Sequence, residues 1–451
     1  MKYKNLLDIV VLAAGKGSRM KSKTLPKPLH SLNGIPMISY LLNQLPLSIF
    51  ANKYIVVPDE HDQIKDAVSK SDNTFNYIKQ LEPRGTGDAL LRTLDSLKSE
   101  NIIIVNSDTP MLKSDSVLNL IDSHINQKSK ISILIDTFDI DIPGDYGAII
   151  KSKEGEIIGV SENNNPNQGK FTEFNVGLYC INLSWLKKSV SKINSHNKEL
   201  YITDLISISA NDGFDVNYSF PLSKYESLGI NDKYQLSVAN KIALKRKNID
   251  LMKKGVNIID PENTYVDYNC DIEPDSTIQP GAIIKSNSII KSNCVIGPNT
   301  EISNSFIEKN TIIKKSVVSD SQIGSEVEIG PYSHIRQNSD ISNNVYIGTN
   351  VEVKKSKIEN GSKLGHFCYI GDSIIEENVN IGAGTVTCNF DGKEKQKTNI
   401  LKNAFIGSGT MIVAPVRIGQ NSVIGAGSVV TKDVENDKLV YGNPATIKKS
   451  L

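Results

Sequence analysis

A loop rich in glycine and basic residues near the N-terminus has the composition of a phosphate-binding site. It reads LAAGKGSRMKSKTLPKPL over residues 12–29, and Gly15 and Gly17 lack side chains that would keep a phosphate away from backbone N–H groups. Among the basic residues of the same loop, Lys16, Arg19 and Lys27 are expected near the phosphate as cations. Fixed positive charge around a phosphoryl group is most of what phosphoryl or nucleotidyl transfer requires from a protein. The loop is not a Walker P-loop, because it lacks the terminal Gly-Lys-Ser/Thr, and it is not the dinucleotide fingerprint, because Met20 stands where the third glycine would be. A solvated basic loop is the alternative.

Two further stretches carry residues suited to the same chemistry. Asp108, in NSDTP, follows the apolar run NIIIV, and the carboxyl end of a strand is where a Mg²⁺ ligand is expected. The alternative is a plain turn aspartate. RGTGDAL, residues 84–90, is a second glycine turn that opens a helix and suits close contact with a base or a phosphate.

The C-terminal half places one imidazole, His366, inside the segment GSKLGHFCYIGD, where neighbouring turns carry Asn or Ser. Imidazole, with an unperturbed pKa near 6.5, accepts a proton near neutral pH. Arg336 and Lys354 lie on earlier repeats, and turns of roughly eighteen residues would stack both cations near one place to bind a phosphate. Tyr369 and Asn380 offer polar contacts to a sugar. A packed or solvated histidine is the alternative.

The composition limits the partners and the compartment. At 451 residues the chain is expected to form two or three domains. Lys and Arg number 51 against 50 Asp and Glu, so no nucleic acid or anionic membrane partner is predicted. Five scattered cysteines without a CxxC pair indicate free thiols in a reducing compartment and argue against zinc. The N-terminal apolar segment is too short to span a membrane and is interpreted as a first strand rather than a signal peptide, so a cytoplasmic location is expected.

The first half alternates strand-like and helix-like segments. Apolar β-branched runs such as DIVVLAAG, KYIVV, NIIIVNSD and KISILID alternate with MISYLLNQL and DSVLNLIDSHI, a pattern typical of βαβ units on a mostly parallel sheet. Ligands bind such sheets at the carboxyl ends of the strands. Residues 233–254 have apolar residues at helical spacing, lack Gly and Pro, and precede Gly255, so they predict a connecting helix.

After Gly255 the sequence period changes to six. Aliphatic residues recur at this spacing in three registers: Val266, Ile272, Ile278, Ile284, Ile290, Ile296 and Ile302; Ile323, Ile329, Ile335, Ile341, Ile347 and Val353; Ile406, Ile412, Ile418, Ile424 and Val430. A short strand and a turn per six residues predict a stacked parallel β-helix. The register breaks near 303–322, 354–363 and 388–399 are expected to be corners or protruding loops.

Together these motifs resemble two known families. LAAGKGSRM, LPKPL, RGTGDA, SDTP, EFNVG, LYITD and GIND resemble the sugar-1-phosphate nucleotidyltransferases, and the hexapeptides resemble the left-handed β-helix acyltransferases. In this order they resemble the bifunctional N-acetylglucosamine-1-phosphate uridylyltransferase and glucosamine-1-phosphate N-acetyltransferase family of bacterial cell-wall synthesis. The resemblance implies an α/β fold: a Rossmann-like nucleotidyltransferase domain (1–231), a linker helix (232–254) and a left-handed parallel β-helix N-acetyltransferase domain (255–451). It also implies Mg²⁺, with acetyl-CoA and UTP as co-substrates, and acetylation before uridylyl transfer.

The same resemblance implies roles for residues of the first domain. Lys27 and Arg19 would be catalytic, and Asp108 with Asn231 would bind Mg²⁺. The nucleotide would contact Leu12, Ala13, Ala14, Gly15, Lys27, Gln80, Gly85, Thr86, Asn106, Ser107 and Asp108. The sugar phosphate would contact Gly147, Glu162, Asn175 and Asn231.

In the second domain the resemblance makes His366 the general base for the 2-amine of glucosamine-1-phosphate. The sugar phosphate would contact Arg336, Lys354, Tyr369 and Asn380. Acetyl-CoA would contact Ala383, Asn389, Phe390, Ser408, Ala426 and Asn443. By analogy the protein is expected to be a homotrimer with acetyltransferase sites between subunits, acting on small-molecule substrates.

The chain departs from the family pattern at four places. Asn106-Ser107 stands where Tyr-Gly is usual, Ala148 where Arg is usual, Phe390 where Tyr is usual and Asn443 where Arg is common. The main alternative is a sugar-1-phosphate nucleotidyltransferase whose β-helix is a non-catalytic oligomerisation stalk. A second is the regulatory subunit of a translation-factor exchange complex. A γ-type carbonic anhydrase is excluded, because only His334 and His366 occur after residue 254.

Overall fold

A computed structural model describes residues 3, 6–137, 146–161, 172–196 and 198–451. The chain divides into two units, Met1–Ala243 and Leu244–Leu451. The described strands of the first unit are β1 Leu7–Leu12, β2 Ser31–Leu32, β3 Ile35–Pro36, β4 Asn52–Val57, β5 Asn76–Lys79, β6 Asn101–Asn106, β7 Ile131–Thr137, β8 Ala148–Lys151, β9 Ile157–Ser161, β10 Glu173–Asn182, β11 Ser195–His196, β12 Glu199–Leu200 and β13 Asn217–Ser219. Its α-helices are α1 Met37–Gln44, α2 Asp62–Ser69, α3 Gly85–Leu91, α4 Ser114–Gln127, α5 Leu183–Ser189, α6 Asp204–Asn211 and α7 Lys233–Lys253, the last of which runs on into the second unit. The 3₁₀ turns are η1 Ser18–Met20, η2 Lys27–Leu29, η3 Leu47–Ile49 and η5 Val190–Lys192.

The first unit is built on one mixed sheet with the order β13-β7-β10-β6-β1-β4-β5. β1 pairs in parallel with both β4 and β6, and only β10 on this path runs antiparallel to its neighbours β6 and β7. The predicted mostly parallel sheet is confirmed. The carboxyl ends of β1, β4, β5 and β6 therefore meet at one edge, which brings together the loops that follow them.

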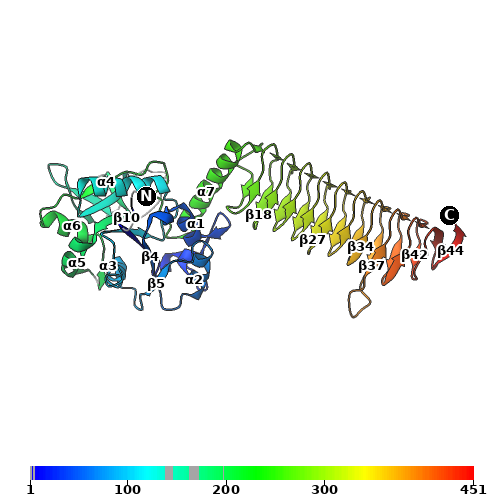
Figure 1. Cartoon of the computed structure of the whole chain (residues 1–451), viewed down its shortest axis with the longest axis horizontal. Coiled ribbons are helices and arrows are strands. Elements are labelled where there is room, and N and C mark those ends of the chain that lie inside the picture. The colour runs from blue at the N-terminus through cyan, green and yellow to red at the C-terminus, as the bar shows by residue number, and fades with distance from the viewer. Residues whose placement is uncertain (1–2, 4–5, 138–145, 162–171, 197) are drawn as a thin grey trace. The chain divides into compact units, whose positions relative to one another are not determined.

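Alternating side chains of these strands build two cores on opposite faces. Val10, Tyr54 and Ile104 pack with residues of α3, α5 and α6 on one face. The intervening residues, such as Val11 and Ile55, are equally buried and point to the other face, as strand geometry requires. Figure 1 shows α4 and α3 on opposite sides of the sheet. Burial on both faces explains why these strands read as continuous apolar runs in the sequence.

The second unit is a parallel β-helix with three faces. The first face contains β14 Asn257–Ile258, β17 Thr277–Ile278, β20 Val295–Ile296, β23 Ile312–Ile313, β26 Glu328–Ile329, β29 Tyr346–Ile347, β32 Lys363–Leu364, β35 Asn380–Ile381, β38 Phe405–Ile406, β41 Val423–Ile424, β43 Lys438–Gly442 and β44 Ala445–Ser450. The second contains β15 Tyr265–Val266, β18 Ile283–Lys285, β21 Glu301–Ser303, β24 Val317–Ser319, β27 His334–Arg336, β30 Glu352–Lys354, β33 Tyr369–Gly371, β36 Val386–Cys388, β39 Met411–Val413 and β42 Val429–Val430. The third contains β16 Asp271–Ile272, β19 Ile289–Ile290, β22 Phe306–Ile307, β25 Gln322–Ile323, β28 Asp340–Ile341, β31 Lys357–Ile358, β34 Ser373–Ile375, β37 Thr398–Ile400 and β40 Val416–Ile418.

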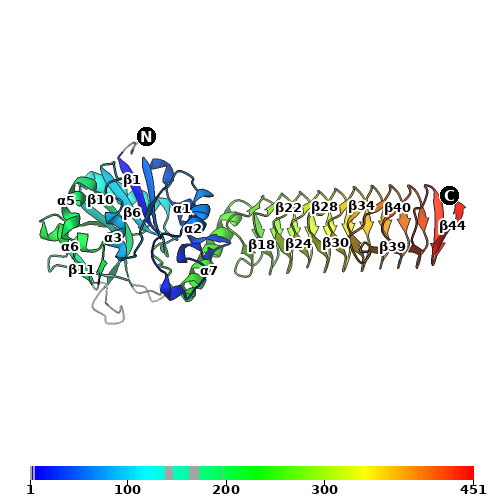
Figure 2. The ribbon, with the colours of Figure 1, turned by 90° about the horizontal axis from the view of Figure 1, so that it is seen from below.

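The aliphatic residues of the six-residue repeat form the core of this β-helix. Every residue of the three predicted registers is buried inside it. Each coil pairs in parallel with the next, so Ile284 stacks on Ile302 and Ile302 on Val318. Figure 2 shows the coils as a regular stack of short strands. The hexapeptide prediction is confirmed.

The three breaks in register have two different physical causes. Ile302 pairs with Val318, 16 residues on, and Val353 pairs with Ile370, 17 residues on, so the first two breaks are shortened turns. By contrast, Ile381 pairs with Ile406, 25 residues on. The additional residues of this coil form the loop that projects beside β37 in Figure 1. Only this third break is a protruding loop.

Candidate functional site

The centre of the N-terminal site is a lysine held between two oxygen atoms. Lys27, in η2, donates from Nζ to Asp108 Oδ2 and to Asn231 Oδ1, each at 2.8 Å. Asp108 follows β6, and Asn231 precedes α7. The two segments are joined by a hydrogen bond from the Ile230 N–H to the Asp108 carbonyl at 2.8 Å. Three predicted residues from distant parts of the sequence thus meet at one point.

The glycine loop is shaped around this lysine. Gly17 adopts φ +59°, a left-handed conformation that favours glycine, and a Cβ there would lie 2.6 Å from Lys27 Cβ. Gly15 has open space around its own Cβ position. Leu12, Ala13 and Ala14 are buried at the carboxyl end of β1. The backbone turn, rather than a side chain, therefore sets how closely the loop approaches the site.

A cavity of about 260 Å³ opens beside the lysine. Its walls include seven residues predicted from the sequence, namely Arg19, Thr86, Asn106, Asp108, Gly147, Asn175 and Asn231. A neighbouring cavity of about 280 Å³ shares Arg19 and Asn231 and adds Lys16, Gly17 and Ser18 of the basic loop. The two cavities together place polar groups and cations around a volume suited to a phosphorylated sugar and a nucleotide tail.

The structure adds residues that the sequence had not indicated. Tyr146 lines the first cavity and its hydroxyl accepts a hydrogen bond from the Gly229 N–H at 3.1 Å, while burial raises its pKa to about 12. Asn175 Nδ2 donates to the Tyr179 hydroxyl at 2.6 Å, which orients this predicted sugar contact. Tyr201 and Thr203 also line the cavity, and the motif LYITD that contains them was the available signal.

The predicted residues of this unit differ in how they lie relative to the cavity. Gln80 and Ser107 are buried and line neither cavity. Asn106 lines the cavity, and its Oδ1 is buried without a hydrogen-bond partner in the part of the chain that the structure describes. Ala148, where the family has Arg, is a buried residue of β8. Glu162 lies outside the described residues.

The donor atoms at this point fit a magnesium ion. Asp108 and Asn231 each present an oxygen at 2.8 Å from Lys27 Nζ, so both oxygens face one position, which the lysine ammonium group fills here and would leave when Mg²⁺ binds. Mg²⁺ prefers oxygen ligands and is held through one or two protein groups plus substrate phosphates. No group of three or more His, Cys, Asp or Glu able to hold a metal occurs among the described residues. A site completed by the substrates is consistent with both observations.

In the β-helix, the predicted cations stack as expected. Arg336, Lys354 and Gly371 occupy one register of the second face on three successive coils. Glu352 accepts from both Nε and Nη2 of Arg336, the first contact at 2.8 Å. Within one chain, therefore, the charge of Arg336 is already partly neutralised, whereas Lys354 stands beside it on the next coil.

His366 lies at the corner between β32 and β33, where it is exposed. Its Nδ1 accepts a hydrogen bond from the Thr349 N–H at 3.3 Å. The lone pair of the neutral ring is therefore at Nδ1 and the proton at Nε2. Asn380, on the first face, and Tyr369, on the second, lie on strands adjoining this corner.

The predicted cofactor residues continue this corner along the stack. Backbone hydrogen bonds join successive turns: Gly384 donates to His366 at 2.7 Å, Gly409 to Ala383 at 2.7 Å and Gly427 to Ser408 at 2.8 Å. Ala426 lies in the last of these turns. The turns are narrow, because a Cβ on Gly382 would lie 2.5 Å from the Ser408 nitrogen. Small residues on successive turns thus form one continuous strip that begins at His366. A strip of this kind could accommodate an extended cofactor.

The projecting loop borders this strip. Asn389 is buried. Its side-chain Nδ2 donates to Asp372 Oδ2 at 2.6 Å, and its backbone carbonyl accepts from the Gln396 N–H at 2.7 Å, which closes the base of the loop. Phe390 is 57% exposed on the loop. Asn443 is exposed in the turn between β43 and β44, and the described contacts do not bring it to His366.

The cysteines near this corner are structural. Cys368 is buried and its Sγ lies 3.3 Å from the carbonyl oxygens of His366 and Gly382. Burial raises the pKa values of the Cys368 and Cys388 thiols, which disfavours the reactive thiolate. All five cysteines of the chain are free.

The fold and the two sites define a protein that joins a nucleotidyltransferase domain to a hexapeptide-repeat acyltransferase domain. Family models agree. Residues 9–140 match the MobA-like NTP transferase domain, residues 266–339 match the GMPPB C-terminal domain, and residues 397–432 match the bacterial transferase hexapeptide (six repeats). The hexapeptide coil is a left-handed β-helix, as the sequence resemblance implied.

Comparison with curated proteins is more specific. The chain is 39% identical over 96% of its length to the bifunctional protein GlmU of Francisella tularensis subsp. tularensis, of which it covers 95%. It is 37% identical over 98% of its length to the same protein of Carboxydothermus hydrogenoformans, of which it covers 99%. A solved UDP-glucose pyrophosphorylase in complex with UDP-glucose shares 20% identity, with a TM-score of 0.44 over 52% of this chain and 97% of that chain. The chain belongs to the GlmU family of bifunctional proteins.

Family membership establishes the two activities. The chain is a bifunctional enzyme of UDP-N-acetylglucosamine synthesis. It N-acetylates glucosamine-1-phosphate with acetyl-CoA, and then transfers a uridylyl group from UTP to N-acetylglucosamine-1-phosphate with release of pyrophosphate. It uses Mg²⁺, UTP and acetyl-CoA, acts on small molecules, and its hexapeptide repeats favour oligomerisation. Over the described residues, no helix combines the length and the apolar character that crossing a membrane requires.

Proposed function

We propose that uridylyl transfer takes place in the cavity beside Lys27. Lys27 would neutralise the nucleotide phosphates, with Arg19 stabilising the charge that develops on the phosphoryl oxygens. The observation that supports this assignment is the meeting of Lys27 Nζ with Asp108 and Asn231, each at 2.8 Å. Bound Mg²⁺, held by Asp108 and Asn231, would supply further positive charge to the phosphates of both substrates.

The remaining predicted residues would position the two substrates. The loop residues Leu12, Ala13, Ala14 and Gly15 would approach the nucleotide through their backbone, and Gln80, Gly85 and Thr86 would hold its nucleoside end, with Asn106 and Ser107 beside Asp108. Gly147, Asn175 and Glu162 would contact the sugar phosphate, whose oxygen attacks the α-phosphorus in line as pyrophosphate leaves. Asn175 is supported in this role by its place on the cavity wall and its contact with Tyr179.

For acetyl transfer, we propose His366 as the base that takes the proton of the attacking 2-amine. Its exposure at a corner continuous with the turns of Ala383, Ser408 and Ala426 supports this role, because the cofactor's thioester must reach the same amine. Arg336, Lys354, Tyr369 and Asn380 would bind the sugar phosphate. Asn389, Phe390 and Asn443 would contact acetyl-CoA.

We further propose a homotrimer in which neighbouring β-helices complete each acetyltransferase site. Ile374, Phe405 and Val413 are exposed apolar side chains on the outer faces of the coils, and their burial between subunits would be favourable. We propose functional domains at 1–231, 232–254 and 255–451, and a cytoplasmic location, which the free state of all five cysteines supports.

The test separates the two sites. His366→Ala is expected to abolish CoA release from acetyl-CoA and glucosamine-1-phosphate while UTP-dependent pyrophosphate release continues. Asp108→Ala is expected to do the reverse. A coupled assay with glucosamine-1-phosphate, acetyl-CoA, UTP and Mg²⁺ reads both products of the wild-type enzyme. For the variants, N-acetylglucosamine-1-phosphate is supplied directly, so that pyrophosphate release does not depend on acetylation. Equal loss of both activities in either variant would overturn the assignment of independent sites, and full acetyl transfer by His366→Ala would favour an idle β-helix stalk.

A further inference from the structure

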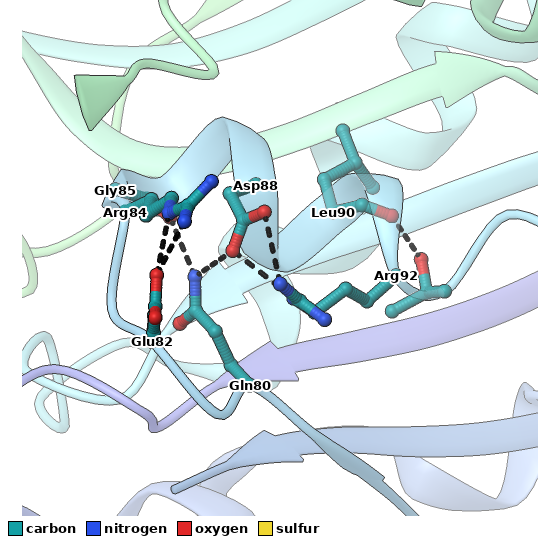
Figure 3. A network of polar contacts seen from close by, with 8 residues as sticks. Gln80, Glu82, Arg84, Gly85, Asp88, Leu90 and Arg92 are labelled. Carbon is teal, nitrogen blue, oxygen red and sulfur yellow. Dashed lines mark hydrogen bonds and ion pairs between the residues drawn. The ribbon is translucent and has the colours of Figure 1, made fainter. Parts of the chain in front are cut away.

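A buried carboxamide next to the nucleotide loop is held by a neighbouring carboxylate. Gln80 follows β5 directly and is only 3% exposed. Its Nε2 donates to the Gly85 carbonyl oxygen at 3.1 Å and to Asp88 Oδ2 at 2.6 Å. Figure 3 shows this network, with Asp88 on the first turn of α3 facing back toward Gln80.

The orientation of the Gln80 amide is determined by its two partners. A backbone carbonyl and a carboxylate are both pure acceptors, so only the –NH₂ end of the amide can face them. Reversing the amide would put its oxygen against two oxygens in a buried setting, where an unsatisfied polar group is costly. Arg92 Nε donates to the same Asp88 Oδ2 at 3.1 Å and so helps to fix the position of this carboxylate. Asp88 therefore holds the amide in one of its two possible orientations.

This arrangement leaves the Gln80 side chain with one hydrogen-bonding atom that no protein group uses. Both hydrogens of Nε2 are engaged, and Oε1 makes no hydrogen bond with protein in the described part of the chain. Gln80 N–H donates to the Val57 carbonyl at 2.8 Å, at the strand edge where the loop after β1 also begins. The side chain thus offers this edge an acceptor and no donor.

We propose that Asp88 is a positioning residue that makes Gln80 an obligate acceptor and so selects uracil over cytosine at the nucleotide site. This inference rests on the proposed function, in which Gln80 contacts the nucleoside end of UTP. Uracil carries an N–H donor at ring position 3, between two carbonyl acceptors. Cytosine carries a bare ring nitrogen there, itself an acceptor. An oxygen that cannot turn away pairs with the first and repels the second, and discrimination of this kind is strong when the protein group is buried.

The sequence already contains a matched control. Glu82 lies in the same loop, forms an ion pair with Arg84 and is exposed, and none of its described contacts reaches Gln80. Glu82→Ala removes an acidic side chain of similar chemistry two residues from Gln80 while leaving the amide and Asp88 in place. Asp88→Asn is the conservative variant, because one amide oxygen can still accept from Gln80 Nε2.

The experiment measures kcat/KM for UTP and the inhibition constant of CTP as a competitor of UTP, in the full-length enzyme. Asp88→Ala frees the amide to turn, so the ratio of CTP inhibition constant to UTP KM should fall by roughly tenfold or more. The fall should appear as a higher KM for UTP and tighter CTP binding, with kcat little changed, because base contacts bind ground and transition states alike. Asp88→Asn should retain most of the selectivity, and Glu82→Ala should retain all of it.

Two results would overturn the proposal. Unchanged selectivity in Asp88→Ala would show that the carboxylate does not control the amide. Equal loss in Asp88→Asn and Asp88→Ala would show that the negative charge, rather than an acceptor atom, matters. Gln80→Leu distinguishes this failure from failure of the proposed function: selectivity unaffected by Gln80→Leu would mean that Gln80 does not contact the base at all. The urea unfolding midpoint of each variant, followed by the fluorescence of Trp185 in the same unit, serves as the folding control.

Discussion

Replacing Gly17 by alanine tests whether the glycine loop works by positioning Lys27. In the structure an added Cβ at Gly17 would lie 2.6 Å from Lys27 Cβ, whereas ordinary contact begins at 3.4 Å, so Lys27 must move by about 0.8 Å. Its Nζ lies 2.8 Å from both Asp108 and Asn231, and a shift of this size breaks at least one of these contacts. A misplacement of about 1 Å in a catalytic group costs on the order of 100-fold in rate. Gly17→Ala should therefore lower kcat/KM for uridylyl transfer by about 100-fold.

The control separates this effect from backbone strain. Gly17 has φ +59° and Gly213 has φ +78°, but a Cβ at Gly213 would meet no atom within 4 Å. Each alanine carries a left-handed backbone penalty of about 1–2 kcal/mol, which lowers stability in both variants. Only Gly17→Ala displaces Lys27, the side chain proposed to neutralise the nucleotide phosphates. Gly213→Ala is therefore expected to melt earlier than the wild type yet keep its uridylyl rate.

The assay follows pyrophosphate release from UTP and N-acetylglucosamine-1-phosphate, and CoA release in the acetyltransferase reaction reports on the other domain. Acetyl transfer should be unchanged in both variants. A folded Gly17→Ala enzyme with wild-type kcat/KM would refute the reasoning, as would an equal loss in Gly213→Ala, since strain alone would then explain the result.

Three further perturbations have defined outcomes. Burial lowers the pKa of His124 from 6.5 to about 4, so the unfolded chain takes up the proton first as the pH falls. Protonation of His124 therefore leaves the free energy of unfolding unchanged above pH 6.5 and lowers it by about 3 kcal/mol by pH 4. Urea unfolding followed by the fluorescence of Trp185, the single tryptophan, should show the stability difference between wild type and His124→Gln shrinking by that amount, and a difference independent of pH would contradict the assignment. Asp8→Ala leaves four donors to a buried carboxylate unpaired and should lower the free energy of unfolding by about 3 kcal/mol in the same assay, whereas an unchanged urea midpoint would disprove its structural role. Asn389→Leu removes the 2.6 Å contact with Asp372 at the base of the projecting loop and should reduce acetyl transfer while uridylyl transfer is kept; normal acetyl transfer would show that the loop needs no such anchor.

Much of the β-helix could be predicted from its repeat alone. Each coil contacts only its neighbours, so a buried Ile or Val every six residues is sufficient to specify the stack. The same regularity indicated that Arg336 and Lys354 would lie on adjacent coils, as they do. What the repeat could not decide is which register breaks shorten a turn and which extrude a loop, because a missing hexapeptide residue is compatible with either.

The N-terminal site depended more heavily on the tertiary structure. Motifs in the sequence indicated Lys27, Asp108 and Asn231 individually. Because these residues are far apart in the sequence, the motifs could not predict that their side chains meet. The sheet order, with β1 between β4 and β6, brings their loops to one edge. The orientation of a side chain is even harder to predict from the sequence. The direction of the Gln80 amide, for example, depends on Asp88, eight residues away and one helical turn into α3.

The amino-acid sequence by itself thus determined the alternation of strands and helices, the six-residue period, and the kinds of chemical group available to each domain. These are local or nearest-neighbour properties, which periodicity and residue type encode directly. The tertiary structure decided which of those groups share a cavity, which way a buried amide faces and at which glycine a side chain would clash. Such features arise from packing between segments far apart in the chain, where a fraction of an ångström separates a contact from a clash.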